Sequence, residues 1–130
     1  MRIVGLDHVQ LAIPVAGEDA ARGFYGGVLG LSEVPKPARL AARGGCWFEG
    51  PRTVIHLGIE DPFTSARKAH AAVLVDDLET ARSELVAVRA PIVDDDTLEH
   101  VQRLYTADPF GNRIELIQAG DGFSERRPNA

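Results

Sequence analysis

The sequence has few of the residues that would tie it to an oxidising compartment, a membrane or a nucleic acid. Its single cysteine, Cys46, cannot form a disulfide within the chain, which is compatible with a reducing cytosol. The opening MRIVGLDHVQLAIP has only short apolar runs, interrupted by Asp7, His8 and Gln10, so it suits neither a signal peptide nor a membrane span. Basic residues are scattered in a chain of net charge −5, unlike a phosphate-binding surface. We therefore expect a cytoplasmic protein that binds neither nucleic acid nor membrane.

What the chain does contain is enough apolar sequence for one core. It has 130 residues, of which 45% are hydrophobic and 25% charged, in the range of a compact soluble domain. The last stretch, AGDGFSERRPNA, is polar and Gly-rich, and we expect it to pack loosely. The composition thus predicts a single domain over 1–130 with a polar tail at 119–130.

The same order of elements occurs twice along the chain. A strand around His8 precedes a helix over about 19–28, and a strand around His70 precedes a helix over 78–89 with Asp76 or Asp77 as its N-cap. A strand around His56 closes the first half and one around Glu115 closes the second, at offsets of 62 (70 − 8) and 59 (115 − 56) residues. Each half reads strand, helix, three strands, which predicts two βαβββ modules at about 3–61 and 67–118. We expect a loop over 35–45 and a turn over 108–112.

Four polar side chains lie opposite the more apolar face of their strands. In TVIHLGIE (53–60), Ile55 and Leu57 point one way and His56 the other. The same alternation places His8, His70 and Glu115 away from the apolar faces, although Asp7 interrupts the apolar set of the first strand. Three imidazoles and one carboxylate suit a divalent metal such as Fe(II), Mn, Ni, Zn or Co. The alternative is that these groups face solvent on an open sheet.

The pattern resembles the vicinal oxygen chelate superfamily, which includes glyoxalase I, type I extradiol dioxygenases, fosfomycin-resistance transferases and bleomycin-resistance proteins. The resemblance spans 6–118 and is most specific in LDHVQLAIP, GFYGGVLGL, KAHAAVLVDDLE and LYTADPFGNRIELIQ. It implies an α+β fold in which paired βαβββ modules form a curved, mostly antiparallel sheet around a metal and substrate cavity. It also implies a homodimer, in which module exchange can place the site between subunits.

By this resemblance, His8, His70 and Glu115 match the shared metal ligands. His56 stands where glyoxalase I has a glutamate ligand and where extradiol dioxygenases have an acid–base histidine, so it is either a fourth ligand or a proton acceptor. Tyr105, ten residues before Glu115, matches a tyrosine of the dioxygenases and would stabilise an oxyanion.

Three further residues are candidates for substrate contacts. Gln10 occupies the position of the catalytic threonine of fosfomycin transferases, which argues against that reaction. Trp47 either faces the cavity or packs in the core. Arg103 shares the parity of Tyr105 and can face the cavity.

We therefore expect a metal-dependent enzyme acting on a small molecule with vicinal oxygens. Fe(II) or Mn is favoured as the cofactor, with Ni, Co or Zn as alternatives. Extradiol dioxygenase-like chemistry is preferred because His56 fits a base better than a substituted ligand. The alternatives are a glyoxalase I-like lyase or isomerase, a non-catalytic binding protein of the bleomycin-resistance type, and a regulatory relic that keeps its ligands without turnover.

Overall fold

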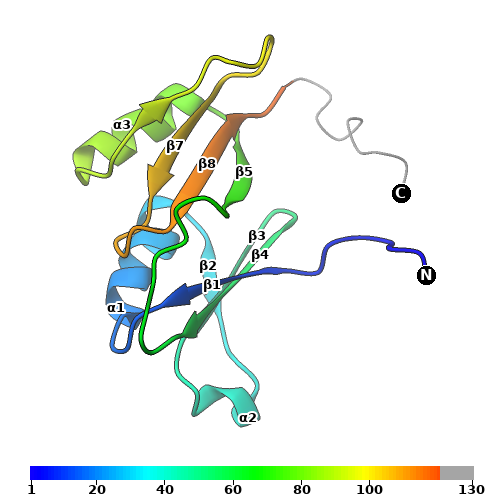
Figure 1. The fold of residues 1–130 in the computed structure, drawn as a ribbon, viewed down its shortest axis with the longest axis vertical. Coiled ribbons are helices and arrows are strands. Elements are labelled where there is room, and N and C mark those ends of the chain that lie inside the picture. The colour runs from blue at the N-terminus through cyan, green and yellow to red at the C-terminus, as the bar shows by residue number, and fades with distance from the viewer. Residues whose placement is uncertain (121–130) are drawn as a thin grey trace.

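A computed structural model describes residues 1–120, so all but the first two residues of the predicted tail lie outside the described part of the chain. Figure 1 shows the predicted α+β fold with two βαβββ modules, which is confirmed. The first module contains β1 (Val9–Ile13), α1 (Glu18–Ala21), η1 (Arg22–Val28), β2 (Ser32–Val34), α2 (Ala38–Ala41), β3 (Cys46–Gly50) and β4 (Thr53–Ile59). The second contains β5 (Ala71–Val75), α3 (Leu78–Ala87), β6 (Val93–Asp94), β7 (Arg103–Ala107) and β8 (Arg113–Gln118).

Each module forms its own four-stranded sheet, in the orders β1-β4-β3-β2 and β5-β8-β7-β6. The first strand of each module pairs in parallel with the last, and the other pairs are antiparallel. Consequently β1 and β5 are edge strands, and within one chain the modules do not join into the single curved sheet that the resemblance implies.

The predicted alternation of faces is confirmed in the central strands. Ile55 and Leu57 of β4 are buried, as are Ile114 and Leu116 of β8, and they belong to one hydrophobic cluster drawn from both modules. Two polar contacts reinforce this shared core. The Tyr25 hydroxyl donates to Asp108 Oδ2 at 2.7 Å, and Asn112 Nδ2 donates to the Ala12 carbonyl at 2.8 Å. The two sheets therefore pack on one shared hydrophobic core.

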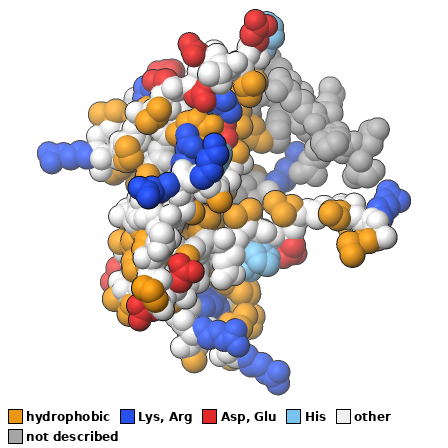
Figure 2. Space-filling view, in the orientation of Figure 1, with side chains coloured by type: hydrophobic (Ala, Val, Ile, Leu, Met, Phe, Trp, Pro, Cys, Tyr) orange, Lys and Arg blue, Asp and Glu red, His pale blue; other side chains and the backbone are white. Residues whose placement is uncertain are grey.

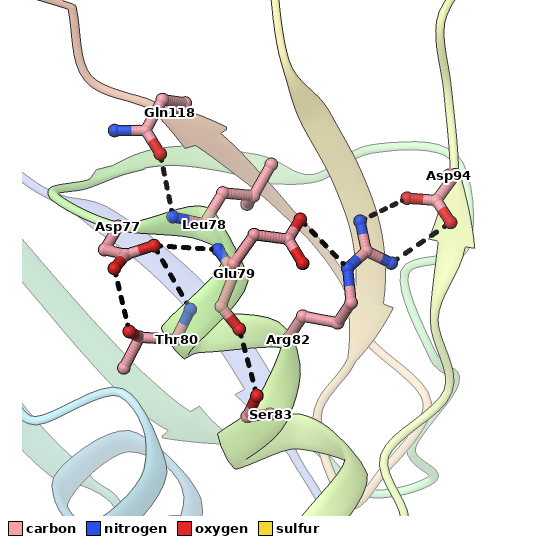
Figure 3. Close-up of polar contacts among 8 residues, drawn as sticks. All are labelled: Asp77, Leu78, Glu79, Thr80, Arg82, Ser83, Asp94 and Gln118. Carbon is pink, nitrogen blue, oxygen red and sulfur yellow. Dashed lines mark hydrogen bonds and ion pairs between the residues drawn. The ribbon is translucent and has the colours of Figure 1, made fainter.

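Helix α3 begins at one of the two N-caps considered from the sequence, Asp77. Its Oδ1 accepts hydrogen bonds from the backbone N–H groups of Glu79 and Thr80 at 3.0 and 3.2 Å (Figure 3). Arg89 adopts a left-handed φ of 58°, and the helix ends at Ala87, slightly earlier than predicted.

The remaining local predictions hold with two differences. The first helix covers the predicted range but changes from α to π geometry at Arg22, and the chain leaves it at Gly30 with φ 72°. The predicted loop over 35–45 contains the short helix α2, which follows Pro37. The turn at 108–112 is present, with Gly111 at φ 87°.

Among residues 1–120, no helix is long and apolar enough to cross a membrane.

Candidate metal and substrate site

His70 and Glu115 meet on the second sheet, on the face opposite Ile114 and Leu116. Glu115 lies at the centre of β8, directly opposite Ala72 of β5 and Tyr105 of β7, and is only 5% exposed. His70 immediately precedes β5. Its Nε2 lies 3.1 Å from Glu115 Oε2, and its Nδ1 lies 2.8 Å from the Lys68 carbonyl oxygen.

The Lys68 carbonyl fixes the tautomer of a neutral His70 imidazole. A carbonyl can only accept, so Nδ1 carries the proton and a neutral imidazole turns its Nε2 lone pair toward Glu115. Two acceptors 3.1 Å apart repel unless a proton or a cation lies with them. The same separation is close to the distance of about 3 Å expected between two ligand atoms that each lie about 2.1 Å from one ion at a right angle. The pair therefore fits a divalent metal, and the Lys68 carbonyl would orient the imidazole.

Arg103 occupies the other oxygen of Glu115. Its Nη1 donates to Oε1 at 2.9 Å, while Nη2 donates to Asp95 Oδ2 at 3.0 Å and to Thr97 Oγ1 at 3.1 Å. The hydrogen bond to Glu115 is the main cause that raises the pKa of Arg103, so the guanidinium stays charged. The pKa of Asp95 is lowered, first by its side-chain hydrogen bond from Thr97.

Tyr105 stands beside this pair. Its ring meets the His70 imidazole edge to face, with centroids 5.4 Å apart and planes at 86°. The guanidinium carbon of Arg113 lies 3.7 Å from the centre of the Tyr105 ring, so Arg113 stacks on the phenol. Among the described residues, Glu115 forms an ion pair with Arg103 and contacts His70, and it forms no ion pair with Arg113.

The first module contributes a stack of three rings. The indole of Trp47 lies parallel to the imidazole of His56, its direct cross-strand neighbour, with centroids 3.8 Å apart. The imidazole of His8 covers His56 at 4.1 Å, and His8 Nδ1 lies 2.7 Å from Asp7 Oδ2. Burial, followed by the nearby His8, lowers the pKa of His56. His56 is therefore a neutral imidazole near neutral pH and able to accept a proton.

This stack lines a cavity of about 800 Å³ together with Gln10, Lys36 and Arg43. Trp47 thus faces the cavity, the first of the two positions considered from the sequence. Because the indole stacks on His56, Trp47 can influence a substrate indirectly, by orienting the His56 imidazole.

The structure brings the predicted metal residues together as two pairs. His8 contacts His56, and His70 contacts Glu115. In residues 1–120 no group of three or more His, Cys, Asp and Glu side chains is close enough to hold one ion. His8 and His70 instead both line a groove of about 1190 Å³ that runs along residues 2–9 and β5. One chain therefore holds the four residues as two pairs, His8 with His56 and His70 with Glu115, and these two pairs with their neighbours are called the half-sites below.

Sequence reasoning missed the polar residues that support these half-sites. Asp95 and Thr97 hold Arg103 from the segment after β6, and Lys36 and Arg43 reach the first cavity from either side of α2. Both segments are irregular, so no strand alternation could have assigned their side chains to a face. The run DDDT at 94–97 is the signal that was available.

Comparisons with known proteins agree with the fold. The model of the glyoxalase-like domain family matches residues 10–117. The crystal structure of a glyoxalase family protein from Bacillus anthracis is 44% identical, with TM-score 0.86, covering 91% of this chain and 97% of that one. No curated protein matches the sequence.

Two more distant solved structures share the fold. A fosfomycin resistance protein from Listeria monocytogenes is 14% identical with TM-score 0.74, covering 92% of this chain and 96% of that one. A lactoylglutathione lyase from Agrobacterium tumefaciens is 20% identical with TM-score 0.66, covering 96% and 100%. From the family model and the Bacillus anthracis structure, this chain belongs to the glyoxalase-like domain family, within the vicinal oxygen chelate superfamily.

Proposed function

We propose that this protein is a divalent-metal-dependent enzyme that acts on a small molecule with two vicinal oxygens, at a site shared between two copies of the chain. His70 and Glu115 of one copy and His8 of the other would hold the ion. Two imidazoles and one carboxylate leave coordination positions open for a bidentate oxygen substrate. Fe(II) or Mn is the favoured metal, with Ni, Co or Zn as alternatives.

The observation that carries this proposal is the contact between His70 and Glu115. Two acceptors are held 3.1 Å apart, with His70 oriented by a backbone carbonyl and Glu115 held by Arg103. Such an arrangement around a buried carboxylate is costly without a cation or a shared proton. A polar pair that merely faces solvent would leave the Glu115 carboxylate exposed, whereas Glu115 is only 5% exposed.

The exposed edges of the two sheets support a second copy as the source of His8. His8 directly precedes edge strand β1, and His70 directly precedes edge strand β5. Pairing of β1 of one copy with β5 of the other would bring these histidines together and cover both unpaired edges. The segment before β1 also exposes apolar side chains, with Ile3, Val4 and Leu6 each more than 80% exposed. Figure 2 shows hydrophobic side chains along the arm that leads to the N-terminus. An isolated chain gains nothing from this exposure, whereas a dimer would bury it.

The residues around the half-sites would then share the chemistry. The bound metal would act as a Lewis acid that polarises the substrate oxygens. His56, neutral and partly buried beside His8, would accept a proton from a substrate hydroxyl. The Tyr105 hydroxyl would donate a hydrogen bond to the oxyanion that develops. Because His56 is stacked between Trp47 and His8, we favour its role as a base over that of a fourth ligand, and hence extradiol dioxygenase-like chemistry.

The metal content of anaerobically purified, untagged protein tests the proposal. We expect about one Fe(II) or Mn per chain by elemental mass spectrometry, and its loss in His70→Ala and in Glu115→Ala. His100→Ala, which changes a histidine outside both half-sites, should keep the metal. Failure to bind any divalent metal after reconstitution would contradict the proposal and leave a non-catalytic binding protein.

The reaction class is tested separately on the loaded protein. Oxygen uptake with a catechol supports ring cleavage, and its loss in His56→Ala with metal retained supports the base. Turnover of a thiol hemiacetal without oxygen uptake would replace ring cleavage by glyoxalase-like chemistry. Loss of metal in His56→Ala would make His56 a ligand.

A further inference from the structure

Arg103 makes the contacts of a residue that positions Glu115. Within the described residues its guanidinium donates to Glu115, Asp95 and Thr97. Its side chain is 14% exposed, and its buried Nε has no hydrogen-bond partner among the described residues. The guanidinium is thus oriented by its two terminal nitrogens, even though this leaves the third donor unpaired.

The two oxygens of Glu115 therefore have different surroundings. Oε1 accepts from Arg103 Nη1 at 2.9 Å, and Oε2 faces His70 Nε2 at 3.1 Å. A carboxylate that is free to rotate can bind an ion through one oxygen or through both. Here one oxygen is already held by a charged donor that is itself fixed by Asp95, and charge-assisted contacts of this kind are among the strongest hydrogen bonds in proteins.

We propose that Arg103 is a positioning residue that holds Oε1 of Glu115 and thereby restricts the metal to Oε2. The inference rests on the proposed metal site and adds to it a reason for the open coordination positions. If both oxygens bound the ion, one coordination position fewer would remain open beside a bidentate substrate, and the ring-cleaving chemistry favoured above needs such a position for dioxygen. Asp95 and Thr97, in the segment between β6 and β7, accept hydrogen bonds from the guanidinium and so hold Arg103 in place.

Co(II) titration of the metal-free protein tests this role without any substrate. Arg103→Lys keeps the positive charge but loses the forked geometry, so we expect the Kd for Co(II) to rise roughly tenfold or more. Arg103→Gln frees Oε1, so the ion gains a ligand atom and the visible absorbance per bound Co(II) falls. Asp95→Asn keeps Arg103 in place but loosens it, and should raise the Kd by a smaller factor, which covers the case in which an Arg103 variant fails to fold.

The matched control is Arg82→Lys. Arg82 is likewise held by a carboxylate, since both of its terminal nitrogens donate to Asp94 (Figure 3). Asp94 precedes Asp95 in the chain but makes no contact with Arg103 or Glu115 among the described hydrogen bonds. The exchange of Arg82 should change neither the Kd nor the spectrum. If the Arg103 variants fold and bind Co(II) with the Kd and spectrum of the original protein, the positioning role is wrong while the metal site stands. If the original protein binds no Co(II), the metal site fails, and the role of Arg103 fails with it.

Discussion

The indole of Trp47 and the imidazole of His56 lie parallel, with ring centroids 3.8 Å apart and planes at 3° to each other. Trp47 is the only tryptophan in the chain, so all tryptophan fluorescence comes from the residue that stacks on His56. The stack joins β3 to β4 on the cavity face of the first module. It also gives the proposed base a fixed orientation.

The pH dependence of tryptophan emission should follow the charge of His56 in metal-free protein. Burial and then His8 lower the pKa of His56, because both disfavour the imidazolium. Emission should therefore change with a midpoint below the ordinary value of 6.5. The charged groups that contribute besides His8 are Asp7, Glu49 and Lys36.

His56→Asn supplies the control for this titration. It removes the titrating ring beside the indole, so the emission change should disappear. A midpoint above 6.5, or a titration that persists in His56→Asn, would be incompatible with a neutral His56 stacked on Trp47.

The N-cap of α3 should make the protein less stable when Asp77 is replaced. Asp77→Ala removes the acceptor of two backbone N–H groups and of the Thr80 hydroxyl, and should lower the Tm at pH 7 by roughly 4 °C (Figure 3). The Thr80 side chain is the first cause of the lowered pKa of Asp77. A carboxylate with a lowered pKa contributes stability above its unfolded pKa of about 3.8 and loses it as the pH falls through the folded value.

The Tm difference between Asp77→Ala and the original protein should accordingly shrink below that pH. Asp76→Ala is the matched control, because its side chain caps nothing and its backbone carbonyl, which accepts from Gln118, is retained. Equal losses in both variants would show that the cap is not the cause.

The buried Tyr25–Asp108 hydrogen bond should couple the two modules. Tyr25→Phe leaves Asp108 Oδ2 with Asn112 as its remaining donor, and we expect a loss of about 2 kcal/mol in the free energy of unfolding. Urea denaturation of Tyr25→Phe, Asp108→Asn and the double variant measures the coupling. Strictly additive losses would contradict a direct interaction.

The same burial gives an optical test. Desolvation, and then Asp108, raises the pKa of Tyr25 far above its ordinary value of 10.0. Tyr25 should therefore give no phenolate absorbance at high pH until the chain unfolds. Phenolate absorbance from both tyrosines in folded protein would be the opposite result.

The alternation of residues in each strand was sufficient to predict the faces of the sheets. It placed His56 opposite Ile55 and Leu57, and Glu115 opposite Ile114 and Leu116, because side chains in a strand alternate whatever the tertiary context. The order of elements predicted the modules for a similar reason, since each helix has its own start and stop signals.

The contacts between segments could not be predicted in this way. Arg103 lies on β7, but two of its partners, Asp95 and Thr97, lie in an irregular segment. The stack of Trp47 on His56 depends on side-chain rotamers. His8 and His70 lie beside the edge strands β1 and β5 of two different sheets, and local patterns do not predict which strands of a sheet remain at its edges.

In the proposed dimer, His8 of one copy completes the site of His70 and Glu115 in the other. This sharing is tested most directly by mixing His8→Ala with Glu115→Ala, allowing the subunits to exchange, and measuring bound metal. Each variant alone has only damaged sites, whereas a mixed dimer has one intact site. Statistical exchange makes half of the dimers mixed, so about a quarter of the original metal content should return.

Mixing His70→Ala with Glu115→Ala, which damage the same half-site, should recover no metal. Native mass spectrometry would establish that mixed dimers form in both experiments. Recovery of about a quarter of the metal in the first mixture alone is the result that the shared site predicts. No recovery in mixed dimers of His8→Ala with Glu115→Ala would contradict it.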